Sequence, residues 1–316
     1  MRFYSNKNKI AKCKRFNQNP KKKYFMKIIK YFFEAIFVYL LFFIIKIFGL
    51  NFGRKIVTQL FVLIGFLFKS KNIVKKNISY ALGDISKDKI DNIIKFMWKN
   101  YANVLVEYLY LHKYRFNEFS SPQVKISGKK VLEDLVKSKR PAVFISGHFG
   151  NFELMAMELE KNKLNLGAIY RPLNNIFLNP FMVYLRKKYI CKYQIKKGKR
   201  GTREVIDLMK RNFSIALMVD QRLGESERFP FFKKPAHTTT LPAQLAIKFN
   251  CDIIPVYLKR NDDNTFDLEI QNPLIIKKTN NHEEDKKRIT IEMNKVIEKM
   301  ILKNPKQWIW THNRWK

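Results

Sequence analysis

The sequence predicts an α/β fold in which a mostly parallel central sheet is covered by helices and is preceded by a hydrophobic membrane anchor. Short apolar runs, typical of strands buried on both faces, alternate with longer stretches of helical periodicity. The N-terminal quarter contains an apolar run of 23 residues, which is long enough to cross the hydrocarbon core of a bilayer. With 316 residues, the chain can hold one large α/β domain in addition to the anchor.

The N-terminal quarter divides into a leader and an anchor region. Residues 1–25 are polar and rich in Lys and Asn, a composition typical of disorder, and one hypothesis is that they do not belong to the native chain. Residues 26–70 form the anchor region, with the long apolar run at 28–50 and a second run at 56–68 that is too short to span comfortably. Since no small-residue cleavage site follows the long run, we expect it to remain as an anchor.

The remainder, residues 71–316, is predicted to form one α/β domain. Its strands are expected at 142–146, 166–170, 215–219, 253–258 and 266–270. The helices around them are expected at 89–112, 129–137, 152–161, 178–189, 203–210, 241–249 and 283–302. This alternation favours a mostly parallel sheet between helices.

One ten-residue segment, SGHFGNFELM at 146–155, carries the strongest functional signal. It places His148 at the end of a predicted strand and Glu153 in the first turn of the next helix. Ligands bind at such strand ends in open α/β sheets, and a His held by a carboxylate is a usual general base. The pattern indicates that His148 removes a proton from a hydroxyl or amine, which then attacks an acyl group. The alternative is that Asn151 merely caps the helix and Glu153 complements its dipole.

This segment resembles the His-x4-Asp/Glu motif of the glycerolipid and lipid A acyltransferases. Further segments resemble the lipid A (lauroyl/myristoyl-type) branch of that superfamily, in the same order from about residue 75 onward. They are YRPLNN at 170–175, VDQ at 219–221, FPFF leading to PAHT within 229–238, and WIWTHNRWK at 308–316. One departure is Lys233-Lys234, where the family pattern has a Gly after the paired Phe, and this leaves the shape of that loop open.

The resemblance implies that residues 71–316 form a glycerolipid-acyltransferase-like domain. It implies transfer of a fatty acyl chain from acyl carrier protein to a hydroxyl of an acylated lipid A precursor. His148 would act as the general base, and Glu153 would hold its ring. Substrate-binding roles are implied for Asn151, Arg171, Asn174, Arg186 and Asp220. The acyl donor is the only cofactor-like molecule implied, and no metal is expected.

Local sequence leaves alternatives open for several of these residues. Arg171 follows a predicted strand and precedes Pro172, which suits bidentate contact with a phosphate or carboxylate, but a solvated loop Arg fits equally well. Asn174 also fits a simple turn. Asp220 ends another predicted strand and is expected to pair with a cation such as Arg222 or Arg171.

The segment 221–240 is interpreted as a long functional loop over the site, with exposed aromatic residues at 229, 231 and 232. His237 is interpreted as a residue of this loop and not as a second base. His312 lies among three Trp residues, which favours a role in packing or at the membrane edge.

Composition limits the partners. The chain has 62 Lys+Arg against 26 Asp+Glu, a net charge of +36, which favours an anionic lipid acceptor, an anionic membrane face or an acidic carrier protein. Nucleic acid is not expected, because the aromatic residues lie within apolar runs and no nucleic-acid motif is present. Three Cys without paired or metal-type spacing indicate a reduced compartment. Nucleotide-binding glycine motifs are also absent from the sequence.

The expected location is the cytoplasmic (inner) membrane, with the catalytic domain facing the cytoplasm. Residues 1–30 carry eleven basic groups and no acid, so this end should stay cytoplasmic. A single crossing would then place the catalytic domain outside, away from a cytosolic donor. Two hypotheses avoid this: the apolar run lies in the interface or returns with the 56–68 run, or the basic leader is not native.

Three other functions remain open on sequence alone. In the first, the protein is an acyltransferase whose acceptor is another glycolipid or a phospholipid. In the second, water replaces the lipid hydroxyl and the protein is an acyl thioesterase. In the third the protein is a non-catalytic, membrane-anchored module that binds anions.

Overall fold

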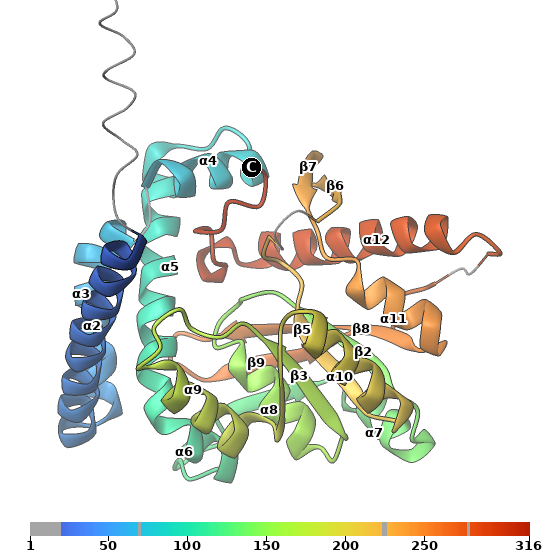
Figure 1. Cartoon of the computed structure of the whole chain (residues 1–316), viewed down its shortest axis with the longest axis horizontal. Coiled ribbons are helices and arrows are strands. Elements are labelled where there is room, and N and C mark those ends of the chain that lie inside the picture. Colours follow the sequence, from blue (N-terminus) through green and yellow to red (C-terminus); the bar gives the residue numbers. More distant parts are fainter. Residues whose placement is uncertain (1–19, 69–70, 223–225, 277–278) are drawn as a thin grey trace, which may run out of the picture.

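A seven-stranded sheet forms the centre of the computed structural model, which describes residues 20–68, 71–222, 226–276 and 279–316 (Figure 1). From one edge to the other, the strands are β1 (Val124–Ser127), β9 (Phe266–Ile270), β8 (Asp252–Arg260), β2 (Ala142–Ser146), β5 (Ser214–Met218), β3 (Leu166–Tyr170) and β4 (Tyr193–Lys196). Neighbouring strands in this sheet run parallel, except that β8 and β9 are antiparallel. The predicted mostly parallel sheet is therefore confirmed.

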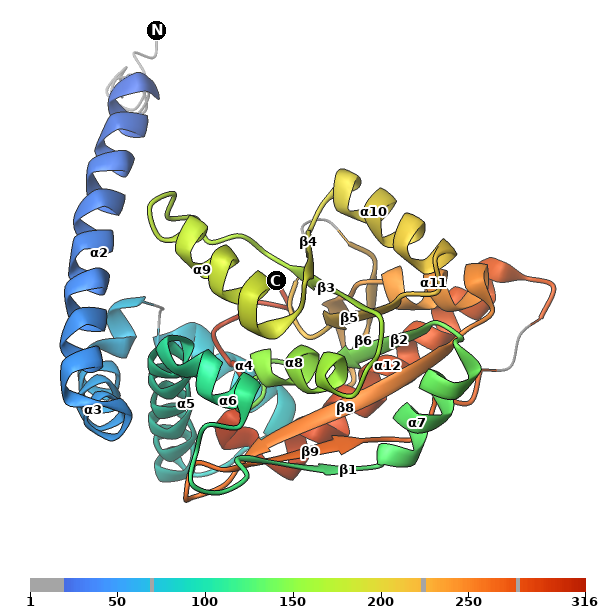
Figure 2. The same cartoon turned by 90° about the horizontal axis from the view of Figure 1, so that it is seen from below.

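Helices cover both faces of the sheet (Figures 1 and 2). The helices that pack on one face are α10 (Lys199–Lys210), α11 (Leu241–Phe249) and α12 (His282–Lys303). Those on the other face are α7 (Lys129–Ser138), α8 (Glu153–Lys161) and α9 (Asn179–Leu185).

Strand β2 shows why this arrangement requires an unbroken apolar run. Successive side chains of a strand point to opposite faces of its sheet. Val143 and Ile145 join the core under α10, α11 and α12, whereas Ala142 and Phe144 join the core under α7, α8 and α9. All four are fully buried, so β2 has no face available to polar side chains.

The N-terminal region consists of helices that stand beside the sheet (Figure 2). They are α2 (Pro20–Phe48), α3 (Leu50–Phe68), α4 (Lys71–Leu82) and α5 (Lys87–Glu107). Gly49, with a φ of +90°, separates α2 from α3 and adopts the left-handed conformation that glycine tolerates best. Helix α3 packs along α5 through an apolar cluster that also includes Phe42 and Ile45 of α2.

Part of α2, residues 24–48, is long and apolar enough to cross a membrane by length and composition, although a signal sequence near an N-terminus passes the same test. Large apolar side chains on this helix are exposed, among them Phe33, Phe37 and Phe43. Residues 20–25, which the sequence analysis assigned to the leader, form the first turns of α2. Residues 1–19 lie outside the described residues.

The five predicted strands are present in the seven-stranded sheet, and the other two strands of this sheet, β1 and β4, were not expected. Both are four-residue strands at the edges of the sheet, and β1 alternates between half-buried and exposed side chains. Neither contains the continuous apolar run that identifies a central strand.

Two predicted helices are interrupted in the structure. The helix expected at 89–112 is split into α5, the short 3₁₀ turn η1 (Tyr108–Tyr110) and α6 (Leu111–Phe116). The helix expected at 178–189 is split into α9 and a π-helical turn, η2 (Arg186–Ile190). Such π turns occur frequently at functional sites.

The segment expected to be a long loop with exposed aromatic residues is partly a β-hairpin, formed by β6 (Arg228–Phe231) and β7 (Lys234–His237). Phe229 and Phe231 are buried, because residues two apart on a strand share a face and this face packs on the core. Phe232 and Lys233 form the turn and both have positive φ angles, 50° and 60°. Lys233, the position at which the family pattern has Gly, is thus a turn residue with a left-handed backbone conformation.

Candidate active site

The site lies at the edge of the sheet where several parallel strands end. Ser146 at the end of β2 pairs in register with Met218 at the end of β5, so the residues that follow the two strands emerge side by side. His148 follows β2 and Asp220 follows β5. The residues after β3 lie at the same edge, because β3 is parallel to β5. Ligands of open α/β sheets bind in this position.

His148 is held by Asp220 through two contacts. Nδ1 of its ring lies 2.7 Å from Oδ1 of Asp220, and its backbone N–H donates to Oδ2 at 2.8 Å. Trp308 donates from Nε1 to the same Oδ2, also at 2.8 Å. The sequence prediction placed Asp220 among the substrate-binding residues and expected it to pair with an Arg, but in the structure its carboxylate contacts the candidate base.

The electrostatics of this pair favour an ionised carboxylate. Burial alone would raise the pKa of Asp220, but the charge and hydrogen bonds of His148 and the Trp308 bond lower it from 3.8 to about 2. An ionised Asp220 accepts a hydrogen bond from Nδ1–H of His148. Nε2 of the ring then carries no proton and keeps its lone pair. That is the tautomer a general base requires.

Glu153 has different partners from those predicted. Its carboxylate accepts hydrogen bonds from Arg186 Nε at 3.1 Å, from Arg186 Nη2 and from the hydroxyl of Tyr108. In this structure the Glu153 carboxylate thus contacts Arg186 and Tyr108, and that it holds the ring of His148 stays a prediction. The first turn of α8 aims the Glu153 side chain at the π-helical turn that carries Arg186. Burial of the Glu153–Arg186 pair, whose side chains are 10% and 11% exposed, makes it a fixed part of the wall of the site.

A cavity of about 340 Å³ opens beside His148. Its polar wall includes His148, Glu153, Gln194, Gln221 and four cations, Arg171, Arg186, Lys197 and Arg222. The apolar part of the wall includes Phe152, Met155, Ile169, Ile190, Leu217 and Ile309. Among the described residues, Glu153 is the one carboxylate in the lining. The cavity therefore suits a ligand that is apolar in part and anionic in part.

The cations repel one another within this cavity. Burial, and then the charge of nearby Arg171, lower the pKa of Lys197 below its usual 10.5. The guanidinium of Arg186 lies over the rings of Tyr170 and Tyr108, with centroid distances of 5.4 and 5.7 Å. An anionic ligand would relieve the repulsion.

Of the predicted substrate-binding residues, Arg171 and Arg186 line the cavity and Asn151 and Asn174 do not, within the part of the chain that the structure describes. Asn151 is buried and donates from Nδ2 to Glu107 at 2.9 Å. Asn174 is exposed on the loop after β3. Its neighbour Asn175 instead donates to the backbone carbonyl of Tyr31, which ties this loop to α2.

Sequence reasoning missed the site roles of Trp308, Gln221 and Lys197. The Trp308 indole is 1% exposed and reaches the carboxylate of Asp220. Gln221 places Nε2 3.1 Å from His148 Nε2. Trp308 and Gln221 belong to segments that carried the family resemblance, but nothing in the local sequence indicates which side chains reach Asp220 or His148.

Residues on either side of His312 in the C-terminal segment belong to the core, and His312 itself is half-buried. Trp310 is fully buried, and Arg314 donates to Asn294 Oδ1 at 2.6 Å and stacks on Phe231 at 3.8 Å. His237 is buried and its Nδ1 lies 2.8 Å from the carbonyl oxygen of Ser226. In the described ranges, no group of three or more His, Cys, Asp or Glu side chains is placed to hold a metal ion.

Comparison with known proteins gives matches over much of the chain. A family model described as bacterial lipid A biosynthesis acyltransferase matches residues 19–316. A lipid A biosynthesis lauroyltransferase of Escherichia coli (strain K12) is 25% identical over 201 residues, which is 61% of this chain and 61% of that protein. A lipid A biosynthesis acyltransferase of Haemophilus influenzae is 23% identical over 252 residues, which is 77% of this chain and 76% of that protein. The match thus spans about three fifths of the length of the first relative.

Proposed function

The chain belongs to the family of bacterial lipid A biosynthesis acyltransferases, and we propose on this basis that it transfers a fatty acyl chain from acyl carrier protein to a hydroxyl of an acylated lipid A precursor. The observation that carries the proposal is the pair of His148 and Asp220 at the edge of a basic, partly apolar cavity. The reaction uses no cofactor beyond the acyl donor.

In the proposed mechanism, His148 Nε2 removes the proton of the acceptor hydroxyl as its oxygen attacks the thioester carbonyl. Asp220 keeps the proton on Nδ1 and stabilises the imidazolium that forms. The tetrahedral intermediate collapses with cleavage of the C–S bond, and the departing thiolate receives the proton from Nε2. An ester is formed, the free thiol of the carrier is released, and His148 returns to its starting state.

Gln221 forms part of the surroundings of the base. Its Nε2 lies 3.1 Å from Nε2 and 3.2 Å from Nδ1 of His148, and a position nearly equidistant from the two ring nitrogens lies over the face of the ring. The in-plane lone pair of His148 Nε2 would therefore accept the hydrogen bond of the acceptor hydroxyl beside the Gln221 amide.

Arg171, Arg186, Lys197 and Arg222 would bind the anionic groups of the substrates, namely the phosphates of the acceptor or of the phosphopantetheine arm. Glu153 would act through Arg186 by holding its guanidinium at the cavity wall. The net charge of +36 would also attract an acidic carrier protein.

The proposed location is the cytoplasmic membrane, with the catalytic domain on the cytoplasmic side, where the carrier protein is present. The exposed aromatic side chains of α2 would contact lipid. The loop after β3 contacts α2 through Asn175 and through Phe177, whose carbonyl accepts a bond from Tyr39 at 3.0 Å. The acceptor lipid would therefore enter the cavity from the membrane side.

Labelled acyl donors test the proposal. The full chain in membranes is incubated with acyl carrier protein bearing a labelled acyl chain and with an acylated lipid A precursor, and products are identified by mass spectrometry. We expect the label on the lipid, and none from a folded His148→Ala protein. Label recovered only as free fatty acid would identify a thioesterase instead. Label on a phospholipid but not on the lipid A precursor would overturn the proposed acceptor.

A further inference from the structure

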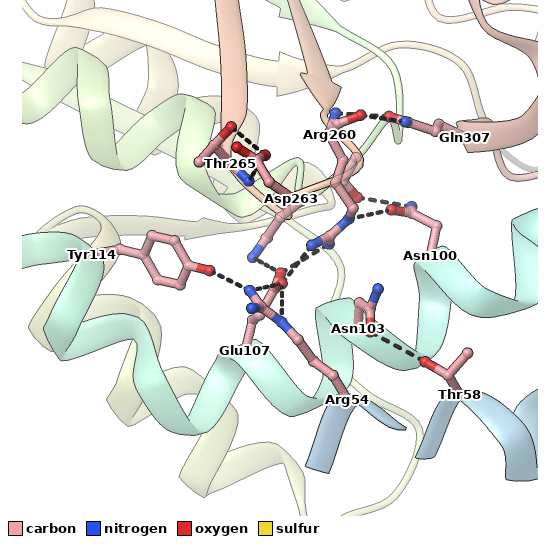
Figure 3. Close-up of polar contacts among 12 residues, drawn as sticks. Arg54, Thr58, Asn100, Asn103, Glu107, Tyr114, Arg260, Asp263, Thr265 and Gln307 are labelled. Atoms are coloured by element: carbon pink, nitrogen blue, oxygen red, sulfur yellow. Dashed lines mark hydrogen bonds and ion pairs between the residues drawn. The ribbon is translucent and has the colours of Figure 1, made fainter. Parts of the chain in front are cut away.

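A second polar cluster has no residue in the lining of the cavity, and the mechanism above does not use it. Figure 3 shows the contacts at its centre. Its centre is Glu107 at the end of α5, whose side chain is fully buried. Arg54 of α3 donates to Glu107 Oε1 from Nη2 at 2.7 Å and from Nε at 3.2 Å. Arg260 at the end of β8 donates to Oε2 at 2.9 Å and also contacts Oε1. We call these residues, with Asn100 and Asn151, the Glu107 cluster.

The cluster holds the loop that carries His148. Asn151, three residues after His148, donates from Nδ2 to Glu107 Oε2 at 2.9 Å. Asn100 receives a bond from Arg260 Nε at 3.0 Å and donates from its own Nδ2 to the carbonyl of Gly150 at 2.9 Å. The loop is thus held on one side by Asp220 and on the other by this cluster.

Gly150 is the point where the loop meets the cluster. Its φ of +49° lies in the left-handed region, and a Cβ there would approach the backbone N of Arg260 and the backbone O of Leu258 to 3.3 Å each. The backbone of β8 therefore packs directly against the loop. A shift of Arg260 would move Gly150, and His148 is only two residues away.

The Glu107 cluster depends on α3, because one of the two cations that neutralise Glu107 comes from this helix. Burial would raise the pKa of Glu107, but the charges and hydrogen bonds of Arg260 and Arg54 hold it below its usual 4.5, so the carboxylate is ionised. One carboxylate thus serves two guanidinium groups that come from different parts of the chain. Arg54 reaches it only while α3 packs along α5.

We infer that Glu107 is a positioning residue for the His148 loop, and that Arg54 makes the geometry of this loop depend on the packing of α3 against α5. The inference rests on the proposed function, because it assumes that His148 is the base. It assigns to the N-terminal helices a role in turnover in addition to membrane attachment. Small displacements of a base strongly reduce the rate of the chemical step.

Variants of the full chain in membranes test this role. Arg54→Gln should lower kcat about tenfold and leave KM for both substrates unchanged, because Arg54 lies outside the cavity lining. Arg54→Lys should recover part of the loss, since it restores a charge but not the two-atom contact. Lys55→Gln is the matched control, an exposed cation on the same helix, and should have wild-type kcat.

Asn100→Ala provides a second, uncharged perturbation in case Arg54→Gln does not fold. It removes the link between Arg260 and Gly150 and should also lower kcat by about tenfold or more. The double variant should lose less than the product of the two single losses, because both act on one loop. Folding is checked by thermal unfolding of each variant, and kcat is referred to the folded fraction.

Folded Arg54→Gln and Asn100→Ala proteins with kcat within about twofold of wild type would overturn the inference, as would losses confined to KM. His148→Ala, measured alongside, separates this result from a failure of the proposed function. If His148→Ala retains activity, the proposed base is wrong. If it is inactive while Asn100→Ala turns over normally, only the positioning role is wrong.

Discussion

Oδ1 of Asp220 lies 2.7 Å from Nδ1 of His148, although 72 positions separate the two residues in the sequence. The carboxylate five residues from His148, Glu153, instead contacts Arg186 and Tyr108. The two carboxylates therefore have separate partners. Asp220 contacts the proposed base, and Glu153 contacts a cation of the cavity wall.

Substitution of each carboxylate by its amide tests this separation. Asp220→Asn should lower kcat at least ~100-fold, because the ring of His148 loses the partner that fixes its tautomer. Glu153→Gln should act mainly through KM, by releasing Arg186. Steady-state kinetics with both substrates distinguish the two patterns. Equal kcat losses with unchanged KM would return Glu153 to the role predicted from the motif.

Neutralising Arg171 and neutralising Arg186 should have different effects on the stability of the fold. Arg171→Gln removes an exposed cation, so it should raise the KM for one substrate and leave thermal unfolding unchanged. Arg186→Gln should raise KM and also cost roughly 3 kcal/mol of unfolding free energy, since it leaves Glu153 buried without its cation. Chemical denaturation of the purified variants measures the difference. Equal stability of the two variants would mean that the Glu153–Arg186 pair contributes little.

The depressed pKa of Asp220 predicts a specific loss of stability in acid. Its pKa of about 2 in the folded protein is below the ordinary 3.8, so the ionised form stabilises the fold above about pH 4. This contribution should disappear as the pH falls from 4 to 2, and it amounts to roughly 2 kcal/mol. The unfolding free energies of wild type and Asp220→Asn, measured by denaturant unfolding across this range, should differ less and less as the pH falls. A difference that is constant with pH would contradict the assignment.

The hairpin turn predicts a stabilising substitution. Lys233 has a φ of 60°, which costs an L-residue energy that glycine avoids. Lys233→Gly should therefore raise the unfolding free energy by about 0.5–1 kcal/mol, after allowance for the greater entropy of unfolded glycine. Lys234→Gly is the control; it lies in strand β7, where glycine is unfavourable, and should not stabilise. A Lys233→Gly protein no more stable than wild type would show that this turn carries no strain.

Strands β2 and β5 were predictable because they are buried on both faces and therefore contain unbroken apolar runs, whereas β9 alternates apolar residues with Asp267 and Glu269. Strand β2 and the position of His148 after it follow from this pattern. The edge strands β1 and β4 were not predictable in the same way, because one face of such strands meets solvent. The hairpin of β6 and β7 was mistaken for a loop because Pro, Lys and Phe alternate in it and the inward-facing residues are few.

The candidate site was predicted in its location but not in its contacts. A motif of local spacing identifies His148 and Glu153, but the partner of the ring depends on which strands are neighbours, and β5 lies next to β2 only in the folded sheet. Glu107 left a local signal, a lone carboxylate among apolar helix residues at 101–110. Its two arginine partners come from distant segments and left none.

The bond from the Trp308 indole to Asp220 has a consequence for biosynthesis. A nascent chain emerges from its N-terminal end, so α2 can reach the bilayer long before residue 308 has been made. Until then, the Asp220 carboxylate lacks one of its hydrogen-bond donors, and the core around Phe231 and Trp310 is incomplete. Helix α2 is thus synthesised well before the Asp220 carboxylate has its third hydrogen-bond donor, and a nascent chain that stops short of Trp308 would hold His148 and Asp220 without that bond.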